Sequence, residues 1–228
     1  MKLMGRIING LKTLLSFLFA YMYDVCVTYP VTKGIYSYFL KVFGKDFTGQ
    51  SVSMLDIGTG TGTPLKSILK KTDCFGRVLA IDINREYLVA AKDNLKKHPN
   101  VEVRYQDFME MAQQTDEKFD IVFFGMSFML MPDQARALQV AKSLLKPGGK
   151  VYMFLTLYHK KNRLAEFIKP KMKWLFSIEF GKVIYYNEVD YSNLVETADP
   201  RIHVQDRKGG AVRLEDQPGP FSIQDLLL

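Results

Sequence analysis

The feature that most constrains this chain is a run of glycines between a strand-like and a helix-like segment. The stretch MLDIGTGTGTPLKSIL occupies residues 54–69. Its apolar residues predict a buried strand at 52–58, and Pro64 stands near the first turn of a helix predicted to end near residue 71, where the missing N–H is not needed. The turn carries glycine at every second position: Gly58, Gly60 and Gly62. Because glycine has no Cβ, we expect a ligand to lie against this bare main chain.

Strand-like and helix-like segments alternate after the glycine turn. Further strands are predicted at the apolar runs of residues 77–83, 101–107, 119–125 and 150–158. Further helices are predicted at residues 85–98 and 132–146, and KPGG at 146–149 is predicted to be a turn. This alternation indicates an α/β fold with a mostly parallel sheet that helices cover on both faces.

The pattern loosens after residue 158. We expect a helix at 161–176 that Pro170 interrupts, and a short helix at 187–198. Two strands are predicted at 201–206 and 211–216, joined by the turn RKGG at 207–210. The tail at 217–228 has no clear pattern of its own.

The chain has 228 residues, which suits one domain with a full hydrophobic core. Its two cysteines, Cys26 and Cys74, argue against a disulfide framework and favour a reducing compartment. The three histidines stand far apart, and no Cys/His cluster has the spacing of a zinc site. We therefore expect no structural metal.

The positive charge is concentrated in two stretches. The net charge of the chain is +7; residues 1–12 carry three basic residues and no acidic one, and residues 160–182 carry seven basic residues against two acidic ones. Such a concentrated excess suggests an anionic neighbour, either phospholipid or nucleic acid, and two solvated helix faces would give the same pattern.

The segment 5–24 has the pattern of an amphipathic helix at a membrane surface. Its polar and small residues form one stripe at three- and four-residue steps: Asn9, Lys12, Thr13, Ser16, Ala20 and Asp24. The other faces are apolar or aromatic, and no small-x-small cleavage site follows, so we expect a helix that lies in the bilayer interface. A helix buried against the domain, a docking helix for a partner subunit and a tilted span remain open. A second helix is predicted at 31–44.

The spacing of the glycine turn disfavours a pyrophosphate site. A dinucleotide fingerprint requires glycine at position 63, which is threonine, and the Gly-Lys-Ser/Thr of a P-loop is absent. Asp56, just before the turn, would repel a phosphate but would attract a cationic ligand.

Four motifs in register resemble the class I S-adenosylmethionine-dependent methyltransferases over roughly residues 50–158. The glycine turn is similar to motif I of that family; AIDIN places Asp82 at the end of the second strand, and YQDF places Asp107 and Phe108 after the third. LLKPGGKVYMF resembles the family's turn into strand five. The resemblance implies a Rossmann-like, doubly wound, mostly parallel sheet with an N-terminal helical extension.

The resemblance also implies where S-adenosylmethionine binds. Asp56 is expected to accept from its ammonium, Asp82 from the ribose hydroxyls and Asp107 from the adenine amino group. In all, we expect cofactor contacts at Asp56, Gly58, Thr59, Gly60, Gly62, Asp82, Ile83, Asp107, Phe108 and Gly125. The chain is thereby divided into amphipathic helices at 1–46, expected to serve as membrane anchor and lid, and a methyltransferase domain at 47–228.

The end of the fourth strand carries FGMSFMLMPD, residues 124–133, instead of the Asn/Asp-Pro-Pro-aromatic tetrad of enzymes that methylate exocyclic amines. Its apolar residues indicate either ordinary packing in the core or an apolar substrate pocket: Met126, Phe128, Met129 and Met131. Candidate catalytic residues are Ser127, Tyr158 and His159, of which the histidine has an unperturbed pKa suited to a base near neutrality. Next to two lysines, His159 also fits an ordinary surface position.

The resemblance is closest to the branch that methylates quinones, sterols, thiols and phospholipid headgroups. It predicts an intracellular, membrane-associated methyltransferase that acts on a lipophilic small molecule, without nucleic acid as a partner. Two alternatives stay open: an RNA or protein methyltransferase that uses the basic stretch 160–182, and a non-catalytic methyltransferase-fold subunit of a membrane complex.

Overall fold

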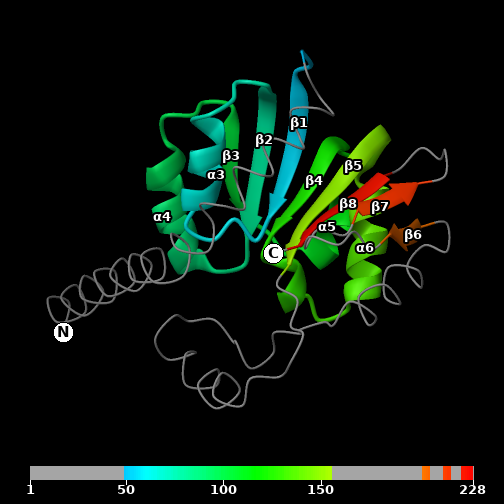
Figure 1. Cartoon of the computed structure of the whole chain (residues 1–228). Coiled ribbons are helices and arrows are strands. Elements are labelled where there is room, and N and C mark those ends of the chain that lie inside the picture. Colours follow the sequence, from blue (N-terminus) through cyan, green and yellow to red (C-terminus); the bar gives the residue numbers. More distant parts are fainter. Residues whose placement is uncertain (1–48, 156–201, 206–212, 217–221, 228) are drawn as a thin grey trace, which may run out of the picture.

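A computed structural model of the chain describes residues 49–155, 202–205, 213–216 and 222–227 (Figure 1). The predicted N-terminal helices at 1–46, the predicted helices between 161 and 198, and the residues Tyr158 and His159 lie outside these described ranges. The helices within the described ranges are too short to cross a membrane.

Six strands form one sheet in the order β3-β2-β1-β4-β5-β8, and every neighbouring pair is parallel. The strands are β1 (Val52–Ile57), β2 (Phe75–Asp82), β3 (Val101–Tyr105), β4 (Phe119–Gly125), β5 (Leu145–Leu155) and β8 (Ser222–Leu227). The predicted doubly wound, mostly parallel sheet is therefore confirmed, and its strand order changes direction at β1, where β4 lies on the other side from β2.

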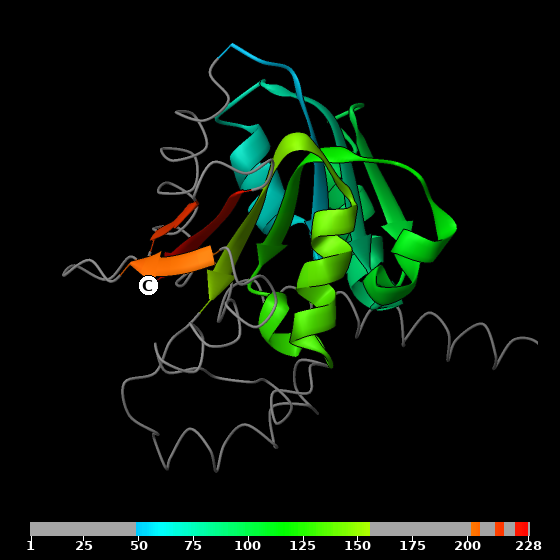
Figure 2. The ribbon, with the colours of Figure 1, turned by 90° about the vertical axis from the view of Figure 1, so that its right-hand side faces the viewer.

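Within the described ranges, four helices cover the two faces of the sheet (Figures 1 and 2). They are α3 (Thr63–Leu69), α4 (Arg85–Leu95), α5 (Phe108–Gln114) and α6 (Gln134–Ser143), and a short 3-10 helix, η2, spans Phe128–Leu130. Alternate residues of each strand face opposite cores, as the pleat requires. Met54 packs with α3 and α4, whereas Leu55 packs with α5 and α6. Both faces are thus buried, which explains the continuous apolar runs of the central strands.

The segment Phe108–Gln114 forms a helix that the sequence did not predict. Asp107 caps it, because its carboxylate accepts from the N–H of Met109 at 2.8 Å. The predicted third strand continued to Asp107, but the observed strand ends at Tyr105. Seven residues are too few for a clear helical period, so the cap, and not the pattern, defines this element.

The KPGG segment is part of β5 instead of a turn before it. Leu145 pairs with Phe119 and Lys150 pairs with Ile121, so the residues between them form an irregularity in the ladder. Gly148 has φ 78°, which a residue with a Cβ adopts at a cost. The predicted turn at 146–149 is therefore wrong, because these residues form an irregular part of the strand.

The tail, which showed no pattern in the sequence, supplies β8 beside β5 (Figure 1). The register runs from Lys150 opposite Ser222 to Leu155 opposite Leu227. Pairing to the open edge of β5 therefore overrides a weak local signal. The two strands predicted before the tail are confirmed as an antiparallel pair, β6 (Ile202–Gln205) and β7 (Arg213–Asp216), and β7 lies against β8.

Candidate active site

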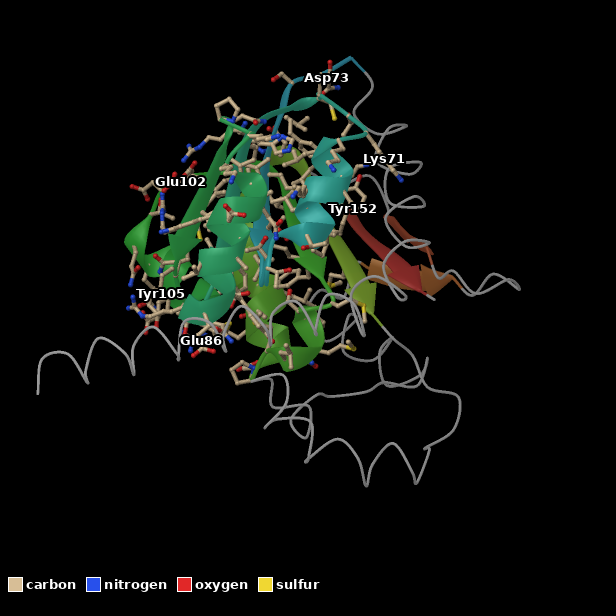
Figure 3. The ribbon with its side chains drawn as sticks, turned by 90° about the vertical axis from the view of Figure 1, so that its left-hand side faces the viewer. Lys71, Asp73, Glu86, Glu102, Tyr105 and Tyr152 are labelled. Atoms are coloured by element: carbon tan, nitrogen blue, oxygen red, sulfur yellow. The ribbon has the colours of Figure 1, made fainter. Side chains whose placement is uncertain are left out.

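A cavity of about 900 Å³ opens at the carboxyl ends of β1, β2, β3 and β4. In Figure 3, Glu86 and Tyr105 mark this edge of the sheet, and Lys71 and Asp73 mark the opposite edge. The cavity lies where the strand order changes direction, which is the usual place for a ligand in an open α/β sheet.

The glycine turn is held on the end of β2 by main-chain hydrogen bonds. The N–H groups of Gly58 and Thr59 donate to the carbonyl oxygen of Ile81 at 2.9 and 3.0 Å. The turn takes positive φ at three positions, with values of 71° at Gly58, 57° at Gly60 and 71° at Gly62. Residues with a Cβ disfavour this left-handed region, so the alternate spacing of glycine follows from the backbone path.

The glycines differ in what surrounds them. A Cβ on Gly60 would meet nothing within 4 Å, and this residue lines the cavity. A Cβ on Gly62 would lie 2.9 Å from the Leu95 side chain and 3.2 Å from the Cα atom of Ala91. Gly60 therefore leaves space for a ligand, as the sequence suggested, whereas Gly62 permits close packing of α4 and does not line the cavity.

Asp82 connects the glycine turn to the start of α4. Its Oδ2 accepts from the N–H of Gly60 at 2.8 Å, and its Oδ1 accepts from the N–H of Asn84 at 2.7 Å. Burial raises the pKa of Asp82, and the hydrogen bonds from Asn84 and Gly60 oppose that rise. Each oxygen keeps a further lone pair, so this carboxylate can also accept from a ligand in the cavity.

Asp56 is buried and does not line the cavity. Burial raises the pKa of this carboxyl group to about 7; the Thr59 hydroxyl opposes the rise and the charge of Asp82 adds to it. Near neutral pH the group is thus balanced between its two protonation states. A cation placed near these two carboxylates would favour the ionised form of both.

The β3 side of the cavity combines aromatic and charged groups. Asp107 is exposed and lines the cavity, and Phe108 lines it while being 3% exposed. The Phe108 ring packs edge-on against Phe124 with centroids 5.4 Å apart. At the rim, the Arg85 guanidinium lies 3.8 Å from the centroid of the Tyr105 ring, a cation–π contact that the sequence did not suggest.

The β4 side of the cavity is made by the chain that follows Gly125. Met126 lines it with φ 70°, a left-handed conformation that costs a residue with a side chain about 1–2 kcal/mol. The Ser127 hydroxyl donates to the carbonyl oxygen of Ile57 and so ties the end of β4 to the end of β1. Ser127 also lines the cavity, and this bond engages its hydroxyl proton; its catalytic role stays a prediction.

The cavity contains seven of the ten positions where cofactor contacts were expected: Gly58, Gly60, Asp82, Ile83, Asp107, Phe108 and Gly125. Asp56, near the end of β1, and Thr59 and Gly62, in the glycine turn, do not line the cavity. Of the four apolar residues after β4, Met126 and Met131 line it, and Phe128 and Met129 are buried in the core. The sequence missed Arg85, Tyr105, Leu130 and Pro132. Arg85 begins α4, Tyr105 ends β3, and Leu130 and Pro132 lie in the segment that follows β4.

The two sides of the cavity differ in charge. All its ionisable lining residues come from the segment 82–107, namely Asp82, Arg85, Glu86, Tyr87, Tyr105 and Asp107. The lining residues from Gly125 to Pro132 include none, and Leu130 among them is 42% exposed. We call the ionisable lining residues of the segment 82–107 the polar side of the cavity, and the lining residues from Gly125 to Pro132 its apolar side. Within the described ranges, no group of His, Cys, Asp and Glu is arranged to hold a metal ion.

Comparisons with known proteins agree with this geometry. A family model described as a methyltransferase domain matches residues 49–189. An arsenite methyltransferase from Aquipseudomonas alcaligenes is 30% identical over 186 residues, which cover 77% of this chain and 49% of that protein. A demethylmenaquinone methyltransferase from Chlorobaculum parvum is 30% identical over 131 residues, which cover 58% of this chain and 48% of that protein. The chain thus spans about half the length of these relatives.

A solved structure shows the same fold. It is the plantazolicin methyltransferase BamL in complex with a triazolic desmethylPZN analog and S-adenosylhomocysteine. The TM-score is 0.61 with 17% identity, and the alignment covers 83% of this chain and 71% of that chain. At this identity the similarity concerns the fold alone.

The raised pKa of Asp56 predicts a pH-dependent effect of Asp56→Asn. Below about pH 3 the carboxyl is mostly neutral in both the folded and the unfolded state, whereas toward pH 8 the folded protein must bury its charge. A pKa that rises from 3.8 in the unfolded state to about 7 in the folded state corresponds to a loss of ~4 kcal/mol of folding stability over this pH interval. The variant should therefore gain stability relative to the wild type as pH increases from 4 to 8, as measured by urea denaturation. A constant difference across that range would contradict this environment for Asp56.

Alanine substitutions at Gly60 and Gly62 should separate ligand space from helix packing. Gly60→Ala should lower the free energy of unfolding by about 1 kcal/mol through its positive φ. Gly62→Ala should lower the free energy of unfolding by roughly 1–3 kcal/mol more than Gly60→Ala does, because its Cβ would press on α4. Calorimetric titration with S-adenosylhomocysteine should show the larger loss of affinity for Gly60→Ala. The reverse order in affinity would place the ligand elsewhere.

Proposed function

The chain belongs to the class I S-adenosylmethionine-dependent methyltransferase family, and on that premise we propose that it methylates a lipophilic small molecule at a membrane surface. The observation that carries the acceptor class is the division of the cavity into a polar side and an apolar side. The polar side suits the cofactor, and the apolar side suits an uncharged acceptor.

The glycine turn and the residues of the polar side fit S-adenosylmethionine. Gly60 provides a cradle of bare main chain that a Cβ would fill. Asp82, with both oxygens already oriented by N–H donors, is placed to accept from the ribose hydroxyls. Ile83 is 65% exposed and would cover one side of the adenine ring, while Asp107 would accept from its amino group. The two coupled carboxylates, Asp56 and Asp82, offset the positive charge of the ammonium and sulfonium groups.

When bound, the cofactor supplies an electrophilic methyl group on a sulfonium. Transfer of this methyl group to an acceptor would break the carbon–sulfur bond, leave neutral S-adenosylhomocysteine, and release a proton from the acceptor. The protein's part is to align the two partners and to exclude water. In the described part of the cavity this falls to the glycine turn on one side and to the residues after Gly125 on the other.

The acceptor class is inferred from the apolar side of the cavity. Met126, Leu130 and Met131 present thioether and alkyl groups, and no charged group stands among the lining residues of this side. A charged acceptor would lose its hydration there without compensation. Relatives named demethylmenaquinone methyltransferase, at 30% identity or slightly less, support a quinone-type acceptor.

An arsenite acceptor is less well supported by the described residues. Trivalent arsenic is a soft centre that favours thiolate ligands. Cys74 lies just before β2, at the edge of the sheet opposite the cavity and beside Asp73 (Figure 3). The described lining of the cavity contains no thiol.

The membrane part of the proposal depends on the sequence of residues 1–24 and 160–182. The first has a broad apolar face, and both have a basic excess. Such segments bind anionic bilayers by combined apolar burial and charge attraction. A lipophilic acceptor would then reach the apolar side from the bilayer, and the cofactor would enter from water.

The acceptor class is tested with a prenylated 1,4-naphthoquinol in detergent micelles and S-adenosylmethionine labelled on its methyl group. We expect labelled quinol and S-adenosylhomocysteine in equal amounts. Leu130→Lys should lower kcat/KM for the quinol about tenfold, because it places a charge on the apolar side, and should leave the Kd for S-adenosylhomocysteine unchanged. Val89→Lys is the matched control, since Val89 is exposed to a similar extent on α4 but lies outside the cavity. Cofactor binding without methylation of the quinol or of a lipid extract would favour a non-catalytic subunit.

The membrane interaction is tested by flotation of the full chain with vesicles of phosphatidylcholine and phosphatidylglycerol. The double variant Leu14→Asp/Leu18→Asp should lose flotation, because it charges the apolar face of 5–24. Ser16→Asp adds a charge to the polar stripe of the same segment and should float like the wild type. Equal flotation of all three proteins would remove the anchoring role of this segment.

A further inference from the structure

Met126 is the one residue with a side chain among the described positions of positive φ. The others are glycines: Gly49, Gly58, Gly60, Gly62 and Gly148. Glycine adopts this conformation without the steric cost that a Cβ adds, so the chain uses glycine wherever the backbone alone matters. A methionine at such a position indicates that its side chain contributes something that glycine could not.

The surroundings of Met126 fix its backbone on both sides. Its N–H donates to the carbonyl oxygen of Phe124 at 3.1 Å, which closes a tight turn around Gly125. The next residue, Ser127, is tied by its hydroxyl to Ile57. The side chain packs against the hydrophobic clusters of both sheet faces, and it also lines the cavity. The thioether thus stands at the base of the apolar side, where the two cores meet the cavity.

The position of Met126 relates it to both sides of the cavity. A Cβ on Gly58 would collide with the Cβ of Ser127 at 2.5 Å, so the glycine turn and the chain after β4 are in direct contact. Met126 therefore lies where the glycine turn meets the apolar side. Because its side chain lines the cavity, an acceptor bound on the apolar side would lie beside it.

We propose that Met126 is a specificity-determining residue that seats a flat, ring-bearing acceptor on the apolar side of the cavity. The inference rests on the proposed function and names the acceptor shape. Thioethers make favourable contacts with aromatic rings and adapt to irregular ones. Met131, which also lines this side, supplies a second thioether, and the exposed Leu130 covers the outer part. The left-handed backbone sets the direction in which the Met126 side chain leaves the main chain, and packing against both hydrophobic clusters limits its movement.

The test compares three substitutions of Met126 in the full chain, with the prenylated naphthoquinol as acceptor. Met126→Leu keeps the volume and should stay within about threefold of the wild type in KM, whereas Met126→Gly should raise KM for the quinol about tenfold. Met126→Phe should lower kcat, because the larger ring displaces the acceptor from the labelled methyl group. The Kd for S-adenosylhomocysteine should change less than about twofold in all three. Met129→Leu is the control in a core methionine outside the cavity.

A purely structural role for Met126 would give a different result. Met126→Gly would then shift the urea midpoint and the Kd for S-adenosylhomocysteine, and KM for the quinol would follow those changes. Methionine methyl NMR gives an independent measure, with 1-naphthol as the probe and S-adenosylhomocysteine present. The Met126 and Met131 signals should shift, and the signal of the buried Met54 should not. No shift at Met126 would overturn the inference even if the quinol is methylated. Shifts without any methylation would retain the seat and reject the proposed reaction.

Discussion

The site depends on the two hydrogen bonds that the carboxylate of Asp82 accepts. This carboxylate accepts from the N–H of Gly60 on one oxygen and from the N–H of Asn84 on the other, and so joins three elements at one point. The carbonyl of Ile81 adds two more bonds to the same turn. The turn is therefore formed and oriented before a ligand arrives, and a ligand does not have to order it. Such preorganisation reduces the entropic cost of binding and explains why a backbone with three left-handed glycines can serve as a fixed surface.

The order of the strands leads directly to the division of the cavity. Segments that follow β2 and β3 supply carboxylates, a guanidinium and aromatic rings, because they cap helices or end strands at the rim. The segment after β4 continues into η2 and supplies thioether and alkyl groups. One cavity therefore offers a polar environment to one ligand and an apolar environment to the other. A charged nucleoside and an uncharged acceptor can meet there, each in surroundings that suit it.

The sequence predicted the parts of this molecule that local chemistry determines. The first five sheet strands, the glycine turn and the placement of Asp82 and Gly125 at strand ends follow from the apolar runs and the turn residues between them, whereas Asp107, predicted to end a strand, caps α5. Prediction from the sequence failed where contacts between residues far apart in the chain determine the structure. Gly62 serves α4 rather than a ligand, which is visible only once Leu95 and Ala91 are in place. The left-handed conformation of Met126, the bond from Ser127 to Ile57 and the contact of Arg85 with Tyr105 have no sequence signal for the same reason.

The pairing of β8 with β5 has a consequence for how the molecule assembles. Ser222 lies opposite Lys150, so this ladder joins segments far apart along the chain, whereas most other sheet contacts link nearer segments. Closing so long a loop is slow in folding, because the entropy must be lost before the pairing compensates for it. Until that ladder forms, β5 presents an open row of amide and carbonyl groups to solvent. An open edge of this kind recruits strands from other molecules, so refolding at high protein concentration would favour aggregation over the monomeric sheet.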